Sequence, residues 1–171
     1  MTRKFRYTWN SIAIIWKWDD KAIHVLLQPY VMTKTKHPWQ KLSGEIKRKF
    51  PGGRSEDHPE DENFLATLKR EILEELGLTL VDDSSAIEVD DLITNDHWLK
   101  SYLIQFDSFS GTIRKDEKLD TKSRLFAPEW VRLSDIQKKT LIKSHWLPFW
   151  KARQVLSKIP PESANKEALV G

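Results

Sequence analysis

The sequence predicts one α/β domain, built as an α/β sandwich with a mixed β-sheet between helices. Apolar runs typical of strands lie on both sides of one strongly amphipathic helical segment, and a second apolar helical segment follows the last of them. Strands flanked by helices in this order fit such a sandwich. At 171 residues the chain is long enough for one domain with a sizeable core. We assign residues 1–158 to this domain and residues 159–171 to a flexible C-terminal tail.

The composition is that of a soluble globular protein, because 39% of the residues are hydrophobic and 31% are charged. The sequence has no cysteine, which excludes disulfides, zinc–thiolate sites and thiol nucleophiles. The apolar run at residues 12–16 is too short for a signal peptide, and no run approaches membrane-spanning length, so we expect a cytoplasmic protein without a membrane partner. A net charge of +3 agrees with an anionic substrate but also with many proteins that have none.

The first half of the chain reads as three strands. Residues 11–27 are predicted to form two strands around a turn at residues 19–21. Residues 30–43 show no periodicity and are predicted to be a loop. Residues 45–50 form the third strand, which leads directly into the sequence Pro51-Gly52-Gly53. Two adjacent glycines let the backbone turn sharply and approach a ligand closely.

The first helix is predicted over residues 64–76. Asn63 suits its N-cap, because the side chain can accept a hydrogen bond from an amide of the first turn. Gly77 suits the position after the last turn, where a left-handed conformation is needed. The buried stripe consists of apolar residues at three- and four-residue spacing, namely Leu65, Leu68, Ile72 and Leu76.

Three further strands follow that helix. Residues 86–93 and 98–109 are predicted to form a pair of strands, and residues 127–133 a final one. The polar residues 111–124 between them are predicted to be a mobile excursion.

A second helix is predicted after the last strand. It is expected to begin near Asp135, because Ser134 can cap it. Apolar residues continue through residues 140–156, and Pro148 is expected to divide this stretch because proline lacks the N–H that a helix interior needs.

Three carboxylates share one face of the first helix. Glu71, Glu74 and Glu75 stand at positions i, i+3 and i+4, so they repel one another unless a cation lies between them. Arg70, four residues before Glu74, relieves part of this repulsion. A hard divalent cation such as Mg²⁺ or Mn²⁺ would relieve it more fully. The ordinary alternative is a solvated acidic face with Arg70 as a surface ion-pair partner.

The residues before the helix favour the metal interpretation. The pattern Gly53…Glu62-x7-Arg70-Glu71-Ile72-x-Glu74-Glu75-x-Gly77-Leu78 resembles the signature of the Nudix hydrolases, G-x5-E-x7-R-E-U-x-E-E-x-G-U, where U is a bulky aliphatic residue. The match has no gap from Glu62 onward. Upstream, eight residues instead of five separate Gly53 from Glu62, and Asp61 stands where a glycine is usual. An insertion of three residues is the simplest account.

The resemblance implies a Nudix-type α/β/α sandwich with a mixed central β-sheet. It also implies a metal-dependent pyrophosphohydrolase that uses Mg²⁺ or Mn²⁺ to cleave the diphosphate linkage of a nucleoside diphosphate derivative, of the nucleotide, nucleotide-sugar or ADP-ribose class. By position, Glu74, Glu75 and the Gly52 carbonyl would be metal ligands, and Glu71 would be a ligand or the general base. Arg70 would orient the glutamates, and Glu62 would stabilise the loop.

Further residues are assigned to the site by weaker signals. Members of the family often recruit another acid, and residues 116–120 offer Asp116, Glu117 and Asp120, of which we choose Glu117; each is otherwise a plain surface charge. Lys47 and Lys49 are predicted to meet substrate phosphates, although exposed strand lysines are usually only solubilising. Gly53 is predicted to approach the substrate.

Aromatic side chains are candidates for stacking on a nucleobase. Phe50 is assigned to the substrate-binding set, with Trp39 and Trp98 as the other choices. The five histidines show no metal-ligand spacing, so His97 and His145 are interpreted as ordinary residues.

Two alternatives to the enzyme are carried forward. The first is a non-catalytic nucleotide-binding or regulatory Nudix module, which is disfavoured because no signature glutamate is missing. The second is an RNA 5′-end pyrophosphohydrolase, which a concentrated basic face would support, whereas the lysines and arginines are spread along the sequence. We therefore expect a small nucleotide-type substrate and disfavour, without excluding, a nucleic-acid partner. A homodimer is compatible with the sequence, which leaves open both the oligomeric state and the particular nucleotide.

Overall fold

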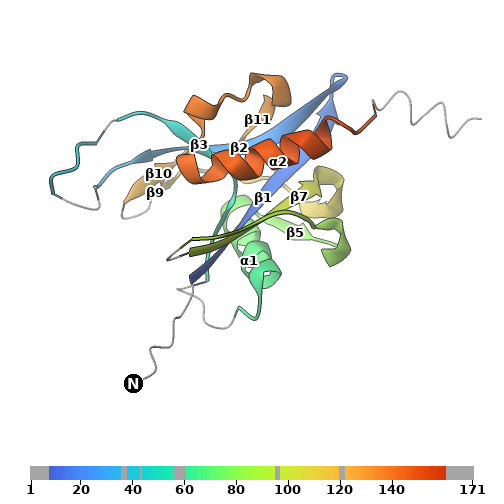
Figure 1. Cartoon of the computed structure of the whole chain (residues 1–171), viewed down its shortest axis with the longest axis horizontal. Coiled ribbons are helices and arrows are strands. Elements are labelled where there is room, and N and C mark those ends of the chain that lie inside the picture. The colour runs from blue at the N-terminus through green and yellow to red at the C-terminus, as the bar shows by residue number, and fades with distance from the viewer. Residues whose placement is uncertain are drawn as a thin grey trace, which may run out of the picture.

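The computed structural model describes residues 8–35, 38–42, 44–55, 61–94, 97–119 and 122–160. In this part of the chain one helix lies on each side of a large mixed sheet (Figure 1), so the predicted α/β sandwich is confirmed. The helices are α1 (Phe64–Leu76) and α2 (Trp146–Leu156), and the strands are β1 (Thr8–Asp19), β2 (Ala22–Met32), β3 (Lys47–Lys49), β4 (Gly52–Arg54), β5 (Leu78–Leu80), β6 (Ile87–Ile93), β7 (His97–Gln105), β8 (Phe109–Gly111), β9 (Lys118–Leu119), β10 (Ser123–Leu125) and β11 (Glu129–Arg132).

Strands β1 and β2 are the centre of the large sheet. Its strands follow the order β6-β7-β1-β2-β10-β9, while β3 and β11 also pair with β2, and β4 pairs with β1. The sheet is mixed because β1 runs parallel to β7 but antiparallel to β2 and β4. Strands β5 and β8 form a separate two-stranded sheet.

The two faces of β1 build two cores because successive strand residues point to opposite faces. Ile12 and Ile14 belong to the core cluster that contains Phe149 of α2. Ala13 and Ile15 belong to the cluster that contains Ile72 of α1. Each helix therefore covers one face of the sheet, which fixes α1 against the strand that also pairs with β4.

Both predicted caps of α1 are present. The side chain of Asn63 accepts a hydrogen bond of 2.8 Å from the Ala66 amide. Gly77 has φ 71°, and its N–H donates to the Leu73 carbonyl at 3.0 Å. The predicted helix bounds are confirmed, so the glutamates occupy the last two turns of a well-defined helix.

The second helix begins later than predicted. Ser134 does not cap a helix near Asp135; instead α2 starts at Trp146, and Pro148 lies in its first turn, where backbone N–H groups need no helical partner. Between β11 and α2 the chain makes short 3-10 turns, η3 (Leu133–Asp135), η4 (Lys138–Thr140) and η5 (Lys143–His145); two others are η1 (Asp83–Ser85) and η2 (Phe106–Ser108).

Two predicted loops contain strand. β2 continues to Met32, inside the segment 30–43, and the polar segment 111–124 holds β9 and β10, which pair with each other. Most of the predicted tail, residues 161–171, lies outside the described residues, whereas Ile159 packs against the core. Within the described part of the chain no helix is long and apolar enough to cross a membrane.

Candidate functional site

Strand β4 brings the two glycines between β1 and α1. Gly52 pairs with Ile12 and Gly53 with Ser11, and the Pro51 carbonyl accepts a hydrogen bond of 2.9 Å from the Ala13 amide. A β-carbon on Gly52 would lie 2.1 Å from the Ser11 carbonyl oxygen, and one on Gly53 would lie 2.3 Å from the Glu71 carboxyl group. Both glycines are therefore needed for the close approach of β4 to its neighbours.

Helix α1 is fastened to β1 through polar contacts at its first turns. The Ser11 hydroxyl donates to the Phe64 carbonyl at 2.7 Å, and the Trp9 indole N–H donates to the Thr67 hydroxyl at 3.2 Å. The helix and the glycine strand thus share β1 as a common support.

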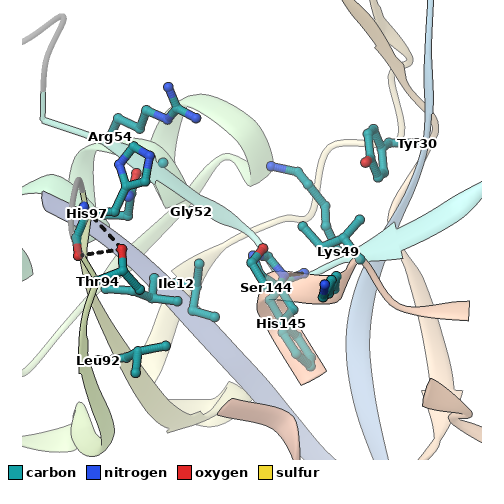
Figure 2. Close-up of a pocket in the computed structure, with 16 residues that line it drawn as sticks. Ile12, Tyr30, Lys49, Gly52, Arg54, Leu92, Thr94, His97, Ser144 and His145 are labelled. Carbon is teal, nitrogen blue, oxygen red and sulfur yellow. Dashed lines mark hydrogen bonds between the residues drawn. The ribbon is translucent and has the colours of Figure 1, made fainter. Parts of the chain in front are cut away.

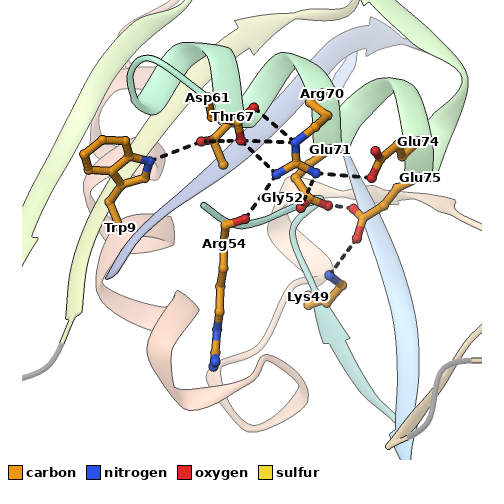
Figure 3. A network of polar contacts seen from close by, with 10 residues as sticks. All are labelled: Trp9, Lys49, Gly52, Arg54, Asp61, Thr67, Arg70, Glu71, Glu74 and Glu75. Atoms are coloured by element: carbon orange, nitrogen blue, oxygen red, sulfur yellow. Dashed lines mark hydrogen bonds and ion pairs between the residues drawn. The ribbon is translucent and has the colours of Figure 1, made fainter. Parts of the chain in front are cut away.

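Glu75 is the most enclosed of the three glutamates, with a side chain only 9% exposed. Its Oε2 accepts a hydrogen bond of 3.1 Å from the Gly52 amide, and its Oε1 lies 3.2 Å from the Lys49 amine (Figure 3). The carboxylate is therefore held between the end of α1 and the chain that enters β4.

Arg70 joins the other carboxylates. Its Nη1 donates to Glu71 at 3.0 Å and to Glu74 at 3.2 Å, while its Nη2 donates to the Arg54 carbonyl at 3.1 Å (Figure 3). Its Nε donates to Asp61 at 3.1 Å. The planar guanidinium can hold all these oxygens at once because its five N–H groups point in fixed directions.

Asp61 is the acid before the helix that contacts Arg70. Asp61 is buried against Arg70 and also accepts a hydrogen bond of 2.9 Å from the Thr67 hydroxyl, whereas Glu62 is exposed. The carboxylate that pairs with Arg70 is thus one residue earlier than the signature position. The acid-dense composition before the helix was the only signal for it.

The pKa of the Glu71 carboxyl group is shifted in opposite directions by its surroundings. Burial raises its pKa above the ordinary glutamate value, and the charge of Glu75 raises it further, while Arg70 lowers it. The charge repulsion predicted from the i, i+3, i+4 spacing is therefore present, and burial and repulsion together outweigh the effect of Arg70 on this pKa.

A cavity of about 800 Å³ opens beside this cluster. Lys49, Gly52 and Gly53 line it, with Thr94 and His97 at one end and Tyr30 at the other (Figure 2). The cavity size falls in the range of small-molecule sites.

His145 lies beneath the cavity and is almost completely buried. Its Nδ1 accepts a hydrogen bond of 3.0 Å from the Phe50 amide, so the ring proton resides on Nε2. Burial, with a smaller effect from the charge of Lys49, lowers the pKa of His145 to about 3. The imidazole is therefore neutral and acts as a hydrogen-bond acceptor.

Two predicted site residues have other partners, and a third is buried in the wall of the cavity. Lys47 donates to the Lys139 carbonyl at 2.6 Å and pairs with Glu45, so its amine does not reach the glutamates. Glu117 pairs with Arg124 of β10. Phe50 belongs to the lining of the cavity, but its ring is completely buried and stacks on His145 with centroids 5.6 Å apart, so it exposes no face to a base.

The other candidates give mixed results. Asp116 is exposed, and Asp120 lies outside the described residues. Trp39 is 77% exposed, while the Trp98 ring packs edge-on against Phe64 with centroids 4.9 Å apart. Tyr30, which sequence reasoning missed, lines the cavity instead.

The donor set suits a hard divalent cation, because carboxylates and a backbone carbonyl are the ligands that Mg²⁺ prefers. Burial is the main cause of the raised pKa of Glu71, and the charges of Glu75 and Glu74 add to it, so a cation bound here would favour the ionised carboxylate. Within the described residues, Glu71, Glu74 and Glu75 are not gathered into one close ligand group; Arg70 and Lys49 hold them instead.

The fold and this cluster define an α/β sandwich whose glycine strand contacts the acidic helix and also lines a cavity. A family model described as the NUDIX domain matches residues 9–149, and the chain therefore belongs to the Nudix family. Comparison with curated proteins gives no match.

Solved structures support the same fold. A MutT structure from a study of Aliivibrio salmonicida and Vibrio cholerae superposes with a TM-score of 0.59 at 16% identity, over 90% of this chain and 100% of that one. The MutT NUDIX hydrolase of Burkholderia pseudomallei gives 0.56 at 22% identity, over 85% and 98%. The NUDIX domain of Shewanella oneidensis NrtR, solved with ADP ribose, gives 0.57 at 18% identity, over 88% of each chain. At these identities the likeness concerns the fold alone.

Proposed function

We propose that this protein is a metal-dependent pyrophosphohydrolase that cleaves the diphosphate linkage of a nucleoside diphosphate derivative. The observation that carries the proposal is the contact between the acidic helix and the glycine strand. Glu75 accepts a hydrogen bond from the Gly52 amide, and the Glu71 carboxyl group occupies the space where a side chain at Gly53 would lie. The two glycines that contact these acids also line a cavity of the size usual for small-molecule sites, which supports the proposal.

Glu74, Glu75 and the Gly52 carbonyl would hold Mg²⁺ or Mn²⁺, with Glu71 as a further ligand or the general base. Such an ion neutralises phosphate oxygens and acidifies water when it is bound. Arg70 orients Glu71 and Glu74 through one guanidinium. Lys49, which lines the cavity and contacts Glu75, is the protein's own cation nearest this carboxylate and is available to meet a substrate phosphate.

The nucleoside would occupy the cavity beside the acids. Its walls combine the apolar side chains of Ile12, Leu92 and Leu99 with polar groups at Asn10 and Thr94. This mixture is typical of small-molecule sites, in which apolar walls provide contact area and a few polar groups fix orientation. Trp98 and Trp39 are not among the lining residues, so no tryptophan stacking is required by this arrangement.

The test is hydrolysis of a panel of nucleotides, nucleotide sugars and ADP-ribose with Mg²⁺, using the native chain and Glu74→Gln. The Glu74 side chain is 45% exposed, so the substitution should leave the fold intact while removing a ligand charge. We expect at least one substrate to be cleaved by the native chain and the variant to lose activity by about 100-fold. Glu88→Gln, an exposed acid on β6, is the control and should retain activity.

The competing function is a nucleotide-binding module without turnover. The pairing of the acids with Arg70 and Lys49 favours it, because these protein cations already neutralise part of the cluster. Binding of a nucleotide by the native chain without hydrolysis of any panel member, with either Mg²⁺ or Mn²⁺, would support the module and exclude the enzyme.

A further inference from the structure

A second hollow adjoins the cavity beside the glutamates. Its volume is about 710 Å³, and Tyr30, Ile142 and Lys143 line both spaces. The rest of its wall comes from Lys47, Lys138, Lys139 and the apolar residues Leu141, Trp146 and Leu147. Four lysines, one from β3 and three from the segment 138–143, are thus gathered around one hollow.

The wall of this hollow is built into the fold. The Ile142 amide donates to the Arg48 carbonyl at 3.0 Å, and the Lys47 amine donates to the Lys139 carbonyl at 2.6 Å. Together with the bond from the Phe50 amide to His145, these contacts hold the segment 138–145 against β3. Because β3 continues directly toward the glycine strand, the lysines of this segment have a fixed position relative to the acids.

Most of these lysine charges are free to meet an anion. Lys139 and Lys143 are exposed, and neither pairs with an acidic residue in the described part of the chain. Lys138 lies with its amine 5.4 Å from the centre of the Trp146 ring. Among the described residues, Lys47 of this group has a carboxylate partner, Glu45, at 3.3 Å.

Aromatic rings accompany the lysines. Trp146 and Tyr30 are both half-buried, so each ring is fixed while part of its surface faces the hollow. Burial raises the pKa of Tyr30, so its hydroxyl remains a neutral hydrogen-bond donor. Lysine amines beside aromatic faces are the combination that binds a phosphate and its nucleoside together.

We propose that this second hollow binds a second nucleotide unit of the substrate, a nucleoside with its own phosphate linkage. This inference rests on the proposed function, since the first unit would occupy the cavity beside the glutamates. The second unit can be the far nucleoside of a dinucleoside polyphosphate or the second nucleotide of a 5′-triphosphorylated oligonucleotide. Both present a phosphate to Lys139 and Lys143 and a base to the aromatic wall.

The test measures binding separately from cleavage. Three uncleavable ligands, with methylene groups in place of bridging polyphosphate oxygens, are titrated calorimetrically in the presence of Mg²⁺: an ATP analogue, a diadenosine tetraphosphate analogue and a 5′-triphosphorylated adenosine trinucleotide analogue. We expect at least one extended ligand to bind about tenfold more tightly than the ATP analogue, as one or two charge-assisted contacts would give.

Lys139→Gln should reduce that ratio of affinities by about three- to tenfold. Lys138→Gln provides a second variant in case the first fails to fold. Lys158→Gln removes the same charge from an exposed position just beyond α2 and should leave the ratio unchanged. The extended ligand whose affinity exceeds that of the ATP analogue by the larger factor identifies the source of the second unit.

Two results would overturn the inference: extended ligands that bind no more tightly than the ATP analogue, or a ratio that Lys139→Gln and Lys138→Gln leave unchanged. Hydrolysis of the cleavable parent compounds is measured in parallel. Cleavage without preference for extended substrates would contradict the second subsite but leave the hydrolase proposal standing. Lysine-dependent binding without cleavage would support the second subsite and contradict the hydrolase proposal. Absence of both binding and cleavage would contradict both proposals.

Discussion

A β-carbon at Gly53 would lie 2.3 Å from the carboxyl group of Glu71, so the Glu71 carboxyl group can take its position only because Gly53 has no side chain. The clash would involve the far end of a flexible side chain, which can move. We therefore expect Gly53→Ala to fold normally but to displace the Glu71 carboxylate. Activity on the preferred nucleotide should fall by about 100-fold, because misplacement of a reacting group by about 1 Å has an effect of this size. Steady-state kinetics and a melting curve provide the measurement.

Gly52→Ala should act on stability instead. Its φ of 146° lies in the region that favours glycine, and a β-carbon would meet the Ser11 carbonyl oxygen at 2.1 Å. Backbone atoms of a central strand cannot move aside, so we expect the free energy of unfolding to fall by roughly 3 kcal/mol or more. Denaturant titration would show this. A Gly52→Ala protein as stable as the native chain would contradict the packing described here.

Arg70→Lys should lower activity by about 10- to 100-fold, the effect usual for groups that orient metal ligands. A single ammonium cannot reach Asp61, Glu71, Glu74 and the Arg54 carbonyl together, as the guanidinium does. The Mg²⁺ concentration needed for half-maximal activity should rise as well, which a purely structural role would not require. The matched control is Lys69→Gln, which removes an exposed pair with Asp83 and should have little effect.

His145 should make the protein sensitive to acid. Its folded-state pKa of about 3 lies below the ordinary value of 6.5, so the unfolded chain binds a proton more readily. Stability from this residue is complete above pH 6.5 and is lost as the pH falls from 6.5 toward 3. In His145→Asn the side-chain oxygen can accept a hydrogen bond from the Phe50 amide. This variant should be less stable at pH 7 but lose less stability on acidification. Urea midpoints at pH 7 and pH 4.5 would measure the difference; parallel losses in the two proteins would refute the role of His145.

The elements that the sequence predicted well are those with local signals. The bounds of α1 follow from apolar spacing, the Asn63 cap and the left-handed Gly77, all of which lie within the helix or next to it. The start of α2 was missed because the segment before it is organised by distant partners. Its contacts to Arg48 and Phe50 leave no mark in the local sequence, and they override the capping signal of Ser134.

The candidate site divides in the same way. The shared face of Glu71, Glu74 and Glu75 follows from helical periodicity alone. Lys47 and Lys49 are equivalent on a predicted strand, but one reaches Glu75 and the other turns to the Lys139 carbonyl. Asp61 and Glu62 are equally acidic neighbours, and only the path of the chain into α1 decides which one meets Arg70. Such choices depend on tertiary packing, which periodicity does not report.

The parallel pairing of β1 with β7 has a consequence for biosynthesis. Residues from Thr8 to Trp16 pair with residues from His97 to Gln105, so one edge of β1 stays open until the ribosome has released β7. During that interval the nascent chain presents an apolar strand with unpaired backbone groups, which is a template for association with other chains. The acidic helix can form early because its caps are local, but the protein is protected from aggregation only after β7 has emerged. Slower translation upstream of β7 should therefore lower the soluble yield.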